Sequence, residues 1–224
     1  MKALPTLLRS LGVSALAALG ISSAFAQDVG NGAMNPTQSK AAMCIGCHGI
    51  PGYQASFPEV HKVPKISGQS EAYLVAALAG YRKGDRKHPT MKAVAASLTD
   101  ADISELASFY AKHGDKSTPA PAPTQAPSAE IQALLSKGNC LACHGENLSK
   151  PIDPSYPKLA GQHADYLYVA LKSYRSGGSA LIGRNNPIMS AQVQSFTPRE
   201  LKLLAQHIAS LPGELRTVSQ SRTR

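Results

Sequence analysis

The pentapeptide C-x-x-C-H occurs twice in this chain, at residues 44–48 and 140–144. It is the attachment motif of c-type haem, in which two thiols add across the vinyl groups of the porphyrin and the adjacent histidine binds the iron. The motifs use all four cysteines of the chain, which are Cys44, Cys47, Cys140 and Cys143. We therefore expect two covalently bound haem c groups, one in each half, with His48 and His144 as proximal iron ligands.

Other roles for the cysteines explain less of the pattern. A four-cysteine zinc site spaces its two pairs by roughly 15–20 residues, whereas 92 residues separate Cys47 from Cys140. A thioredoxin-like pair follows a strand, and no strand pattern precedes either motif. Two structural disulfides would not need a histidine after each pair. Haem attachment is the interpretation that uses both histidines.

Residues 1–26 have the features of an export leader. Lys2 and Arg9 are followed by an apolar run at 11–21, and the segment ends in the small-x-small sequence of residues 24–26. The run is short for a membrane span of about 20 residues, so we expect cleavage near Gln27 rather than a retained anchor. Because c-type haem is attached outside the bacterial cytoplasm, the leader predicts a periplasmic protein.

The remainder of the chain contains two copies of one design. Residues 64–69 match residues 157–162 at an offset of 93, and Tyr-Leu and Tyr-Arg pairs recur at the same offset. This ordered agreement indicates tandem duplication, and a Pro/Ala-rich stretch between the copies is typical of an extended linker. The expected organisation is a leader at 1–26, an N-terminal domain at 27–115, a linker at 116–128, a C-terminal domain at 129–213 and a basic disordered tail at 214–224.

Hydrophobic spacing predicts helices in both copies, and strand-like alternation is absent. The middle helix carries Tyr73, Leu74, Ala77, Leu78 and Tyr81 in one copy and Tyr166, Leu167, Ala170, Leu171 and Tyr174 in the other. The last helix starts at a capping box, 99–102 or 197–200, and its stripe is Ile103, Leu106 and Tyr110, or Leu201, Leu204 and Ile208. The predicted fold is all-α, with two tandem domains each wrapped around one haem. Neither copy contains Trp, so the porphyrin supplies apolar mass that such small domains otherwise lack.

Met91 and Met189 are the expected sixth iron ligands. They occupy equivalent places, which we expect to be loops before the last helix. Met34 lies outside the repeat, and Met43 adjoins Cys44, too close to reach the opposite haem face. Core filling is the alternative role for a methionine. His/Met ligation raises the reduction potential and is typical of electron-carrying cytochromes.

Five further histidines are weaker candidates, because none has a counterpart in the other copy. They are His61, His88, His113, His163 and His207. His88, three residues before Met91, is the closest competitor. We place His163 at the start of the middle helix and His207 on the last helix.

Two prolines are candidates to orient the proximal histidines. The carbonyls of Pro64 and Pro157 can accept the imidazole N–H and fix its tautomer, although a simple turn is the alternative role for each. Arg82 and Arg175, at the ends of the middle helices, could pair with haem propionates or remain solvated.

A formal net charge of +9 and a basic stretch at 62–92 indicate docking onto acidic redox partners. The basic residues of this stretch are Lys62, Lys65, Arg82, Lys83, Arg86, Lys87 and Lys92. Surface solubility is the alternative role. Nucleic acid is not an expected partner of an exported haem protein.

Taken together, these motifs resemble the cytochrome c4 family over about residues 28–212. The resemblance rests on two C-x-x-C-H domains, P-K-[I/L]-x-G-Q after each, and a methionine shortly before a Leu-Thr-Asp or Phe-Thr-Pro helix start. It implies two class I cytochrome c folds related by a pseudo-twofold axis, with haem propionates facing each other across the interface. It also places the iron ligands on His48 with Met91 and on His144 with Met189.

From these features we expect a periplasmic electron carrier and not an enzyme. It would pass single electrons from a membrane quinol-oxidising complex to a haem-copper terminal oxidase. One alternative is a cytochrome subunit of a periplasmic dehydrogenase, such as a sulfide-oxidising flavocytochrome. Another is a dihaem peroxidase or small-ligand sensor, which needs an open iron site. The matched methionines argue against that last alternative.

Overall fold

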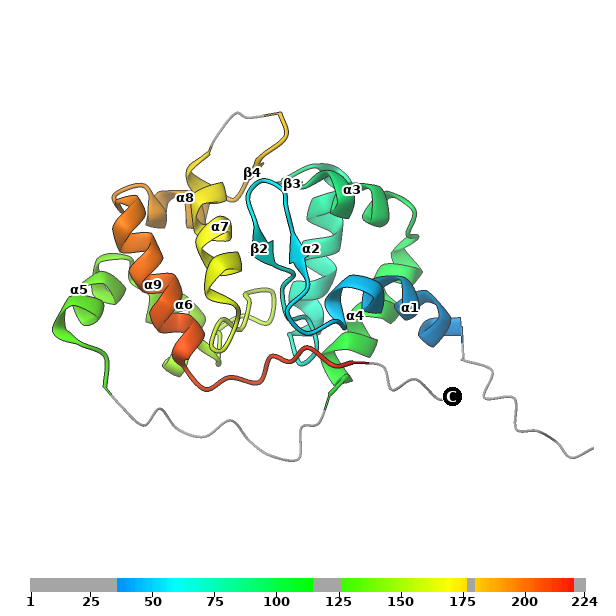
Figure 1. The fold of residues 1–224 in the computed structure, drawn as a ribbon, viewed down its shortest axis with the longest axis horizontal. Coiled ribbons are helices and arrows are strands. Elements are labelled where there is room, and N and C mark those ends of the chain that lie inside the picture. The colour runs from blue at the N-terminus through cyan, green and yellow to red at the C-terminus, as the bar shows by residue number, and fades with distance from the viewer. Residues whose placement is uncertain (1–35, 115–125, 177–179, 220–224) are drawn as a thin grey trace, which may run out of the picture. The chain divides into compact units, whose positions relative to one another are not determined.

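A computed structural model describes residues 36–114, 126–176 and 180–219, which belong to one compact unit, Met34–Arg224 (Figure 1). The predicted leader, Met34, linker residues 116–125 and tail residues 220–224 lie outside the described residues. The described chain is mainly helical, which confirms the all-α prediction. The predicted domain boundaries stay predictions.

The described part of the N-terminal domain contains four α-helices and three two-residue strands. The helices are α1 (Pro36–His48), α2 (Glu71–Lys83), α3 (Pro89–Ala96) and α4 (Asp100–Lys112), and the strands are β1 (Gln54–Ala55), β2 (His61–Lys62) and β3 (Arg86–Lys87). Strands β1 and β2 pair antiparallel. Their hairpin lies between α2 and α7 in Figure 1.

The described part of the C-terminal domain repeats the order of the helices, but its haem-motif helix is divided in two and a 3-10 helix replaces the β1–β2 hairpin. Its elements are α5 (Ala129–Lys137), α6 (Cys140–His144), a 3-10 helix (Glu146–Leu148), α7 (Ala164–Arg175), β4 (Gly183–Arg184), α8 (Pro187–Val193) and α9 (Pro198–Ser210). The helix that carries the haem motif is continuous in the first copy but is broken between α5 and α6 in the second. Asn139 adopts a left-handed conformation at the break, with φ of 44°, which asparagine tolerates better than most residues.

Each domain buries the faces that helical spacing predicts. In the N-terminal domain Leu74, Ile103, Leu106 and Tyr110 form one core cluster, and in the C-terminal domain Leu167, Leu201, Leu204 and Ile208 belong to another. Both capping boxes are present, at the starts of α4 and α9. These caps satisfy backbone N–H groups that have no partner within the helix.

The methionine segments are helices and not loops. Met91 lies on α3 and Met189 on α8. Each helix has a polar N-cap followed by proline at its first position, a combination that favours helix initiation. The loop prediction was wrong because this His-Pro or Asn-Pro signal precedes only a short helix.

The described part of the predicted tail is ordered against the N-terminal domain. Leu215 is 1% exposed, and the Arg216 N–H donates to the Ser67 carbonyl at 3.0 Å. Figure 1 shows the segment in red, running from α9 toward α4. The expectation of disorder was therefore wrong for residues 214–219. A leucine within a basic tail can be buried where it finds a neighbouring surface.

Candidate haem sites and the domain interface

Each haem motif ends a helix, so that its histidine points into the domain. In the N-terminal domain the motif is the last turn of α1, and His48 Nδ1 lies 2.8 Å from the Pro64 carbonyl oxygen. In the C-terminal domain the motif forms α6, and His144 Nδ1 lies 3.0 Å from the Pro157 carbonyl oxygen. The structure therefore contains both hydrogen bonds that the sequence predicts.

These hydrogen bonds decide which ring nitrogen is available. A carbonyl oxygen can only accept, so Nδ1 carries the proton in both histidines and Nε2 keeps its lone pair. Burial lowers the pKa of His48 and of His144, although the proline carbonyls oppose the shift. Both rings are therefore neutral near pH 7, which is the form that binds iron. The donor set fits a haem: two thiols to attach the porphyrin and one oriented imidazole to bind the metal.

The cysteines show no competing use. In the described ranges none of the four cysteines is joined to another by a disulfide. In the ranges that the structure describes, no three His, Cys, Asp or Glu side chains are grouped to hold a metal ion. The described geometry thus offers neither the zinc site nor the disulfides considered from the sequence.

The two candidate distal methionines occupy matching positions near the starts of their helices. The Met91 N–H donates to His88 Nδ1 at 3.4 Å, and the Met189 N–H donates to Asn186 Oδ1 at 2.9 Å. His88 is therefore the N-cap of α3 and the counterpart of Asn186. Iron ligation by Met91 and Met189 stays a prediction, and it is supported by this matched placement.

The remaining histidines have structural surroundings of their own. His61 is 4% exposed and its Nδ1 lies 2.8 Å from the Glu59 carbonyl oxygen. His113 Nδ1 lies 2.9 Å from Ser67 Oγ. His163 is the N-cap of α7 and His207 lies on α9, as the sequence predicts.

The two arginines suggested for haem propionates differ from each other. Arg82 donates to the Leu98 carbonyl at 3.2 Å and pairs with Asp100 at 2.5 Å, so its charge is already balanced. Arg175 Nε is buried and has no hydrogen-bond partner among the described residues. Neither observation places these side chains at a haem edge.

Two glutamines that the sequence analysis left without a role join the domains. The buried side chain of Gln69 accepts from the Lys158 N–H at 2.9 Å and donates to the Lys158 carbonyl at 3.0 Å. Gln162 does the same with Lys65, at 3.0 and 2.9 Å. The repeat of Pro-Lys and Gly-Gln in both copies was the signal that could have revealed this reciprocal pairing, because each copy supplies one half of it.

The lysines of the same motif add a second pair of contacts. Lys65 Nζ donates to the Gly161 carbonyl at 2.6 Å, and Lys158 Nζ donates to the Gly68 carbonyl at 3.1 Å. The interface is therefore two-fold symmetric in its hydrogen bonds, as expected from the duplicated sequence.

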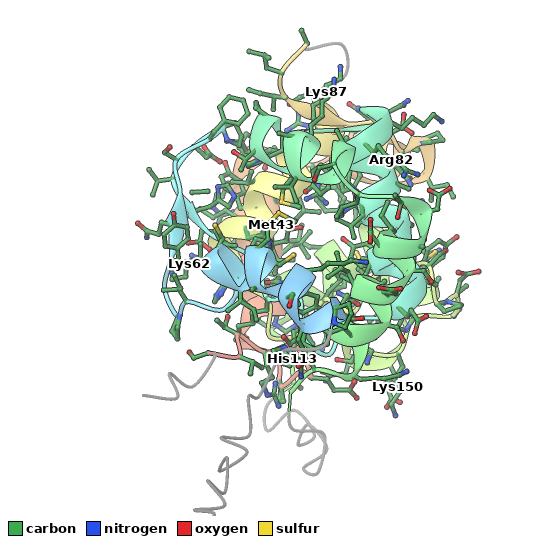
Figure 2. The ribbon with its side chains drawn as sticks, turned by 90° about the vertical axis from the view of Figure 1, so that its right-hand side faces the viewer. Met43, Lys62, Arg82, Lys87, His113 and Lys150 are labelled. Atoms are coloured by element: carbon green, nitrogen blue, oxygen red, sulfur yellow. The ribbon has the colours of Figure 1, made fainter. Side chains whose placement is uncertain are left out.

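Three of the seven basic residues in the stretch 62–92 form ion pairs among the described residues. Figure 2 shows Met43 near the centre of one face, with Lys62, Arg82 and Lys87 toward its margin. The ion pairs of the stretch are Lys62–Asp165, Arg82–Asp100 and Lys83–Asp85. Docking of acidic partners onto this stretch stays a prediction.

Apolar side chains lie exposed beside both haem motifs. Met43 and Ile50 flank the first motif and are 49% and 46% exposed. Leu141, within the second motif, is 48% exposed, and Ile152 is 72% exposed. The Ile152 N–H donates to the Cys143 carbonyl at 3.1 Å, which fixes this side chain next to the attachment site. No helix in the described ranges has the length and apolar composition to cross a bilayer.

Comparison with known proteins identifies a matching family model and several relatives of the chain. The family model described as Cytochrome c matches residues 128–212. Cytochrome c4 of Azotobacter vinelandii is 29% identical over 227 residues, which covers 94% of this chain and 99% of the relative. Over most of its length the chain is similar to members of the cytochrome c4 family. Each of its two Cys-x-x-Cys-His motifs is a site of covalent haem c attachment.

Two further comparisons extend this assignment. The solved structure of cytochrome c4 from Acidithiobacillus ferrooxidans matches with a TM-score of 0.57 at 23% identity, covering 76% of this chain and 99% of that chain. This match shows the fold that cytochrome c4 shares with the chain. The thiosulfate dehydrogenase electron acceptor of Thiomonas intermedia is 29% identical and covers 77% of this chain and 80% of the relative. Like cytochrome c4, the chain is an electron carrier.

Proposed function

We propose that this cytochrome carries single electrons in the periplasm between a membrane quinol-oxidising complex and a haem-copper terminal oxidase. The haem iron supplies one-electron chemistry. The observation that supports a carrier most strongly is the matched placement of Met91 on α3 and Met189 on α8, the candidate distal ligands that would complement His48 and His144. When both axial positions are filled by the protein, no position remains for a substrate.

The periplasmic location rests on the leader-like segment 1–26 and on the presence of covalent haem c. The proposal that a redox partner docks beside the haem motifs rests on exposed apolar side chains there, such as Leu141 and Ile152. Exposed apolar patches of this kind mark interaction sites. Electron transfer to a partner is fastest where the haem lies near the contact surface, so a patch beside the attachment site suits this role.

Spectroelectrochemical titration of the purified holo-protein tests the carrier role. We expect two positive midpoint potentials and low-spin spectra of Met-ligated haem in both domains. A strongly negative midpoint, or a high-spin haem that binds carbon monoxide under native conditions, would contradict the carrier role and favour a peroxidase or a sensor.

Stopped-flow reduction by a quinol-oxidising complex tests the partner and the docking surface. We expect Ile152→Lys to slow the second-order reduction several-fold, because a charge beside the motif disrupts apolar docking. Val60→Lys is the matched control, since Val60 is 65% exposed on the β1–β2 hairpin. Equal rates for the two variants would exclude docking through the Ile152 surface.

A second candidate function is that of cytochrome partner to a periplasmic sulfur-compound dehydrogenase. The observation that favours it is the 29% identity with a thiosulfate dehydrogenase electron acceptor. A sulfide-oxidising flavocytochrome would use such a subunit in the same way. Copurification with a dehydrogenase, and reduction by thiosulfate or sulfide only in its presence, would support this role over the respiratory one.

A further inference from the structure

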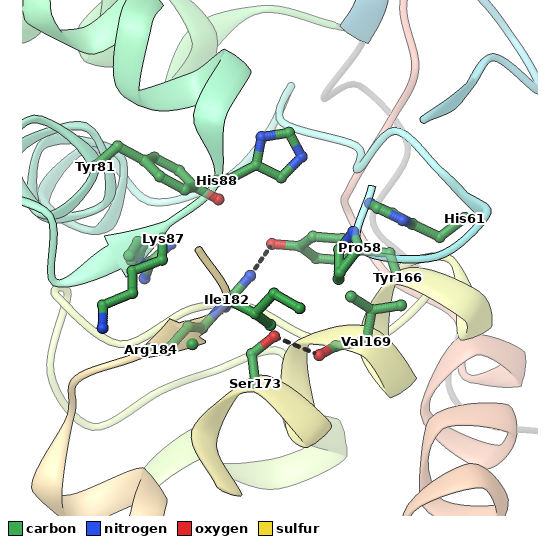
Figure 3. Close-up of a pocket in the computed structure, with 12 residues that line it drawn as sticks. Pro58, His61, Tyr81, Lys87, His88, Tyr166, Val169, Ser173, Ile182 and Arg184 are labelled. Carbon is green, nitrogen blue, oxygen red and sulfur yellow. Dashed lines mark hydrogen bonds between the residues drawn. The ribbon is translucent and has the colours of Figure 1, made fainter. Parts of the chain in front are cut away.

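Several contacts that join the two domains are duplicated, and duplicated contacts act on both haem sites alike. Strands β3 and β4 pair antiparallel across the interface and place Arg86 opposite Arg184. Figure 3 shows the pocket beside them, which is lined by His88 from one domain and by Tyr166 and Arg184 from the other. A difference between the two haem sites is therefore best sought in a segment that occurs only once.

The segment after α9 is such a segment, and we call residues 214–219 the C-terminal strap. The residues after α4, by contrast, lead into the Pro/Ala-rich linker. The strap is anchored on the N-terminal domain, because Leu215 is buried there and the Arg216 N–H donates to the Ser67 carbonyl at 3.0 Å. These anchors bring residues 217–219 to the N-terminal domain.

The end of the strap lies against the first haem motif. Gly49 directly follows His48, and a Cβ on Gly49 would lie 3.1 Å from the Val218 carbonyl oxygen. A Cβ on Gly114, which lies just after α4, would be 3.4 Å from Val218 Cγ2. Val218 therefore lies between the end of the haem-motif helix and the end of α4, and Gly49 beside it is buried.

The second haem motif is covered differently. Gly145 follows His144, and a Cβ there would lie 1.7 Å from the carbonyl oxygen of Lys150, in the loop of the same domain. Leu141, which takes the place of Ile45 in the repeat, is 48% exposed, whereas Ile45 is half-buried. The first motif thus obtains from the far end of the chain a contact that the second obtains from its own loop.

A segment that covers a haem motif changes the free energy of haem oxidation. Oxidation adds one positive charge to the iron, and a charge is less stable where protein replaces water. The protein shell around a metal site controls solvent access and so tunes the reduction potential. Cover by the strap therefore favours the reduced form of the N-terminal haem, with little effect on the C-terminal haem.

We propose that strap residues 217–219 shield the first haem motif from water and selectively raise the midpoint potential of the N-terminal haem. Val218 is the positioning residue, because its carbonyl lies against Gly49 and its side chain against Gly114. The two haem sites of a duplicated fold thereby become unequal. The proposal rests on haem attachment at residues 44–48 and not on the identity of any redox partner.

Two C-terminal deletions test the proposal in the holo-protein. The first removes residues 217–224, and its control removes only residues 220–224. Both keep Leu215 and both lose the same two arginines, so the two variants differ only in residues 217–219. By spectroelectrochemistry we expect the longer deletion to lower one midpoint potential and to leave the other unchanged. Equal potentials in the two variants would overturn the proposal.

Val218→Gly tests the same contact without a new chain end near the motif. It removes the side chain that lies against Gly114 and adds no charge, so a terminal carboxylate cannot cause the effect. We expect a decrease in the same midpoint potential, smaller than in the deletion. Val60→Gly is the matched control, since Val60 is 65% exposed. If Val218→Gly had the potentials of Val60→Gly, the effect of the deletion would come from the new carboxylate, and shielding would be excluded.

Hydrogen exchange in the reduced protein shows which haem motif the strap covers. The Gly49 amide donates to the Ile45 carbonyl at 2.9 Å, and the equivalent Gly145 amide donates to the Leu141 carbonyl at 3.0 Å. In the longer deletion, relative to its control, we expect faster exchange at Gly49 and unchanged exchange at Gly145. Unchanged exchange at Gly49, or equal acceleration at both glycines, would contradict selective cover of the first motif.

Discussion

A single backbone carbonyl sets the chemistry of each proximal histidine. Pro64 and Pro157 accept from Nδ1 of His48 and His144, which leaves Nε2 as the iron donor. Proline suits this position because its restricted φ fixes the direction of the chain around the carbonyl. On the distal side, local structure also positions the candidate ligand, which is the flexible thioether of a methionine near the start of a short helix.

Replacing Met91 by leucine tests the distal ligand. The two side chains have similar volumes, so we expect little change in stability. We expect one haem to become high-spin, to bind carbon monoxide when reduced, and to lose a substantial part of the ~0.8 V range over which axial ligands set potentials. Absorption spectra and midpoint potentials measure this. Met43→Leu, at a 49% exposed position, is the control, and an unchanged low-spin haem in Met91→Leu would remove Met91 from the ligand set.

Glu200 predicts a pH dependence of stability. The Thr197 backbone N–H, the Lys137 ammonium and the Thr197 hydroxyl lower its pKa from 4.5 to about 2. A carboxyl whose pKa is lower in the folded state stabilises fully above its unfolded pKa and loses this effect as the pH falls. We therefore expect the Tm of the holo-protein to exceed that of Glu200→Gln at pH 6, and the difference to vanish between pH 4.5 and 2. A difference that persists at pH 2 would exclude this cause.

At the scale of elements, the hydrogen bonds of Gln69 and Gln162 couple the segments that precede α2 and α7. Each glutamine amide binds both polar backbone groups of one lysine in the other domain. An amide can do this because it carries a donor and an acceptor side by side. A glutamate at the same place could accept but not donate when it is ionised.

Truncating Gln69 leaves the Lys158 backbone without partners. We expect Gln69→Ala to cost about 1–3 kcal/mol for each buried group left unpaired, and to speed hydrogen exchange of the Lys158 amide. Exchange measured by NMR or mass spectrometry reports this site directly. Gln132→Ala is the control, since Gln132 makes an exposed hydrogen bond to the Pro127 carbonyl within its own domain. If the Lys158 amide exchanged as slowly in Gln69→Ala as in the wild type, the Gln69–Lys158 hydrogen bonds would not contribute to the stability of this segment.

The helix starts explain why some helices could be predicted from the sequence and others were taken for loops. The capping boxes at Thr99 and Thr197 were found from sequence because their partners lie three residues away. The starts of α3 and α8 use His88 and Asn186 as caps. These also lie three residues from their partners, but a histidine cap is less familiar and the helices that follow are short.

At the scale of the whole molecule, contacts other than the linker join the domains. The β1–β2 hairpin packs on α7, where Lys172 contacts Glu59 at 2.8 Å. The segment after α9 crosses to the N-terminal domain, where Leu215 is buried. A Cβ on Gly68 would lie 2.5 Å from the Glu214 carbonyl oxygen, so only glycine lets this segment approach so closely. The absence of a side chain at Gly68 thus permits the crossing.

Replacing Leu215 by alanine tests whether this crossing stabilises the pair of domains. We expect a loss of about 2–5 kcal/mol in the free energy of unfolding, as for other buried leucines, measured by denaturant titration of the holo-protein. Val60→Ala, at a 65% exposed position, should change stability by less than about 0.5 kcal/mol. A Leu215→Ala variant as stable as the control would mean that the C-terminal segment is dispensable.

The sequence by itself determined the features that depend on neighbouring residues. The haem motifs, the helical faces, the capping boxes and the pairing of each proximal histidine with a proline could all be predicted, because their parts lie within one motif or within 13–16 residues. Duplication helped, since each feature appeared twice in the same order.

Only the tertiary structure decided the partners that one domain supplies to the other. Gln69 and Gln162 bind backbone 89 and 97 residues away, Arg86 meets Arg184 across β3 and β4, and the segment around Leu215 lies on the N-terminal domain. The sequence identifies these residues, but it does not predict which surface of one domain contacts the other. A side chain between domains acquires its partner only when the surfaces of the two domains come together, and no pattern within one motif encodes which surface that is.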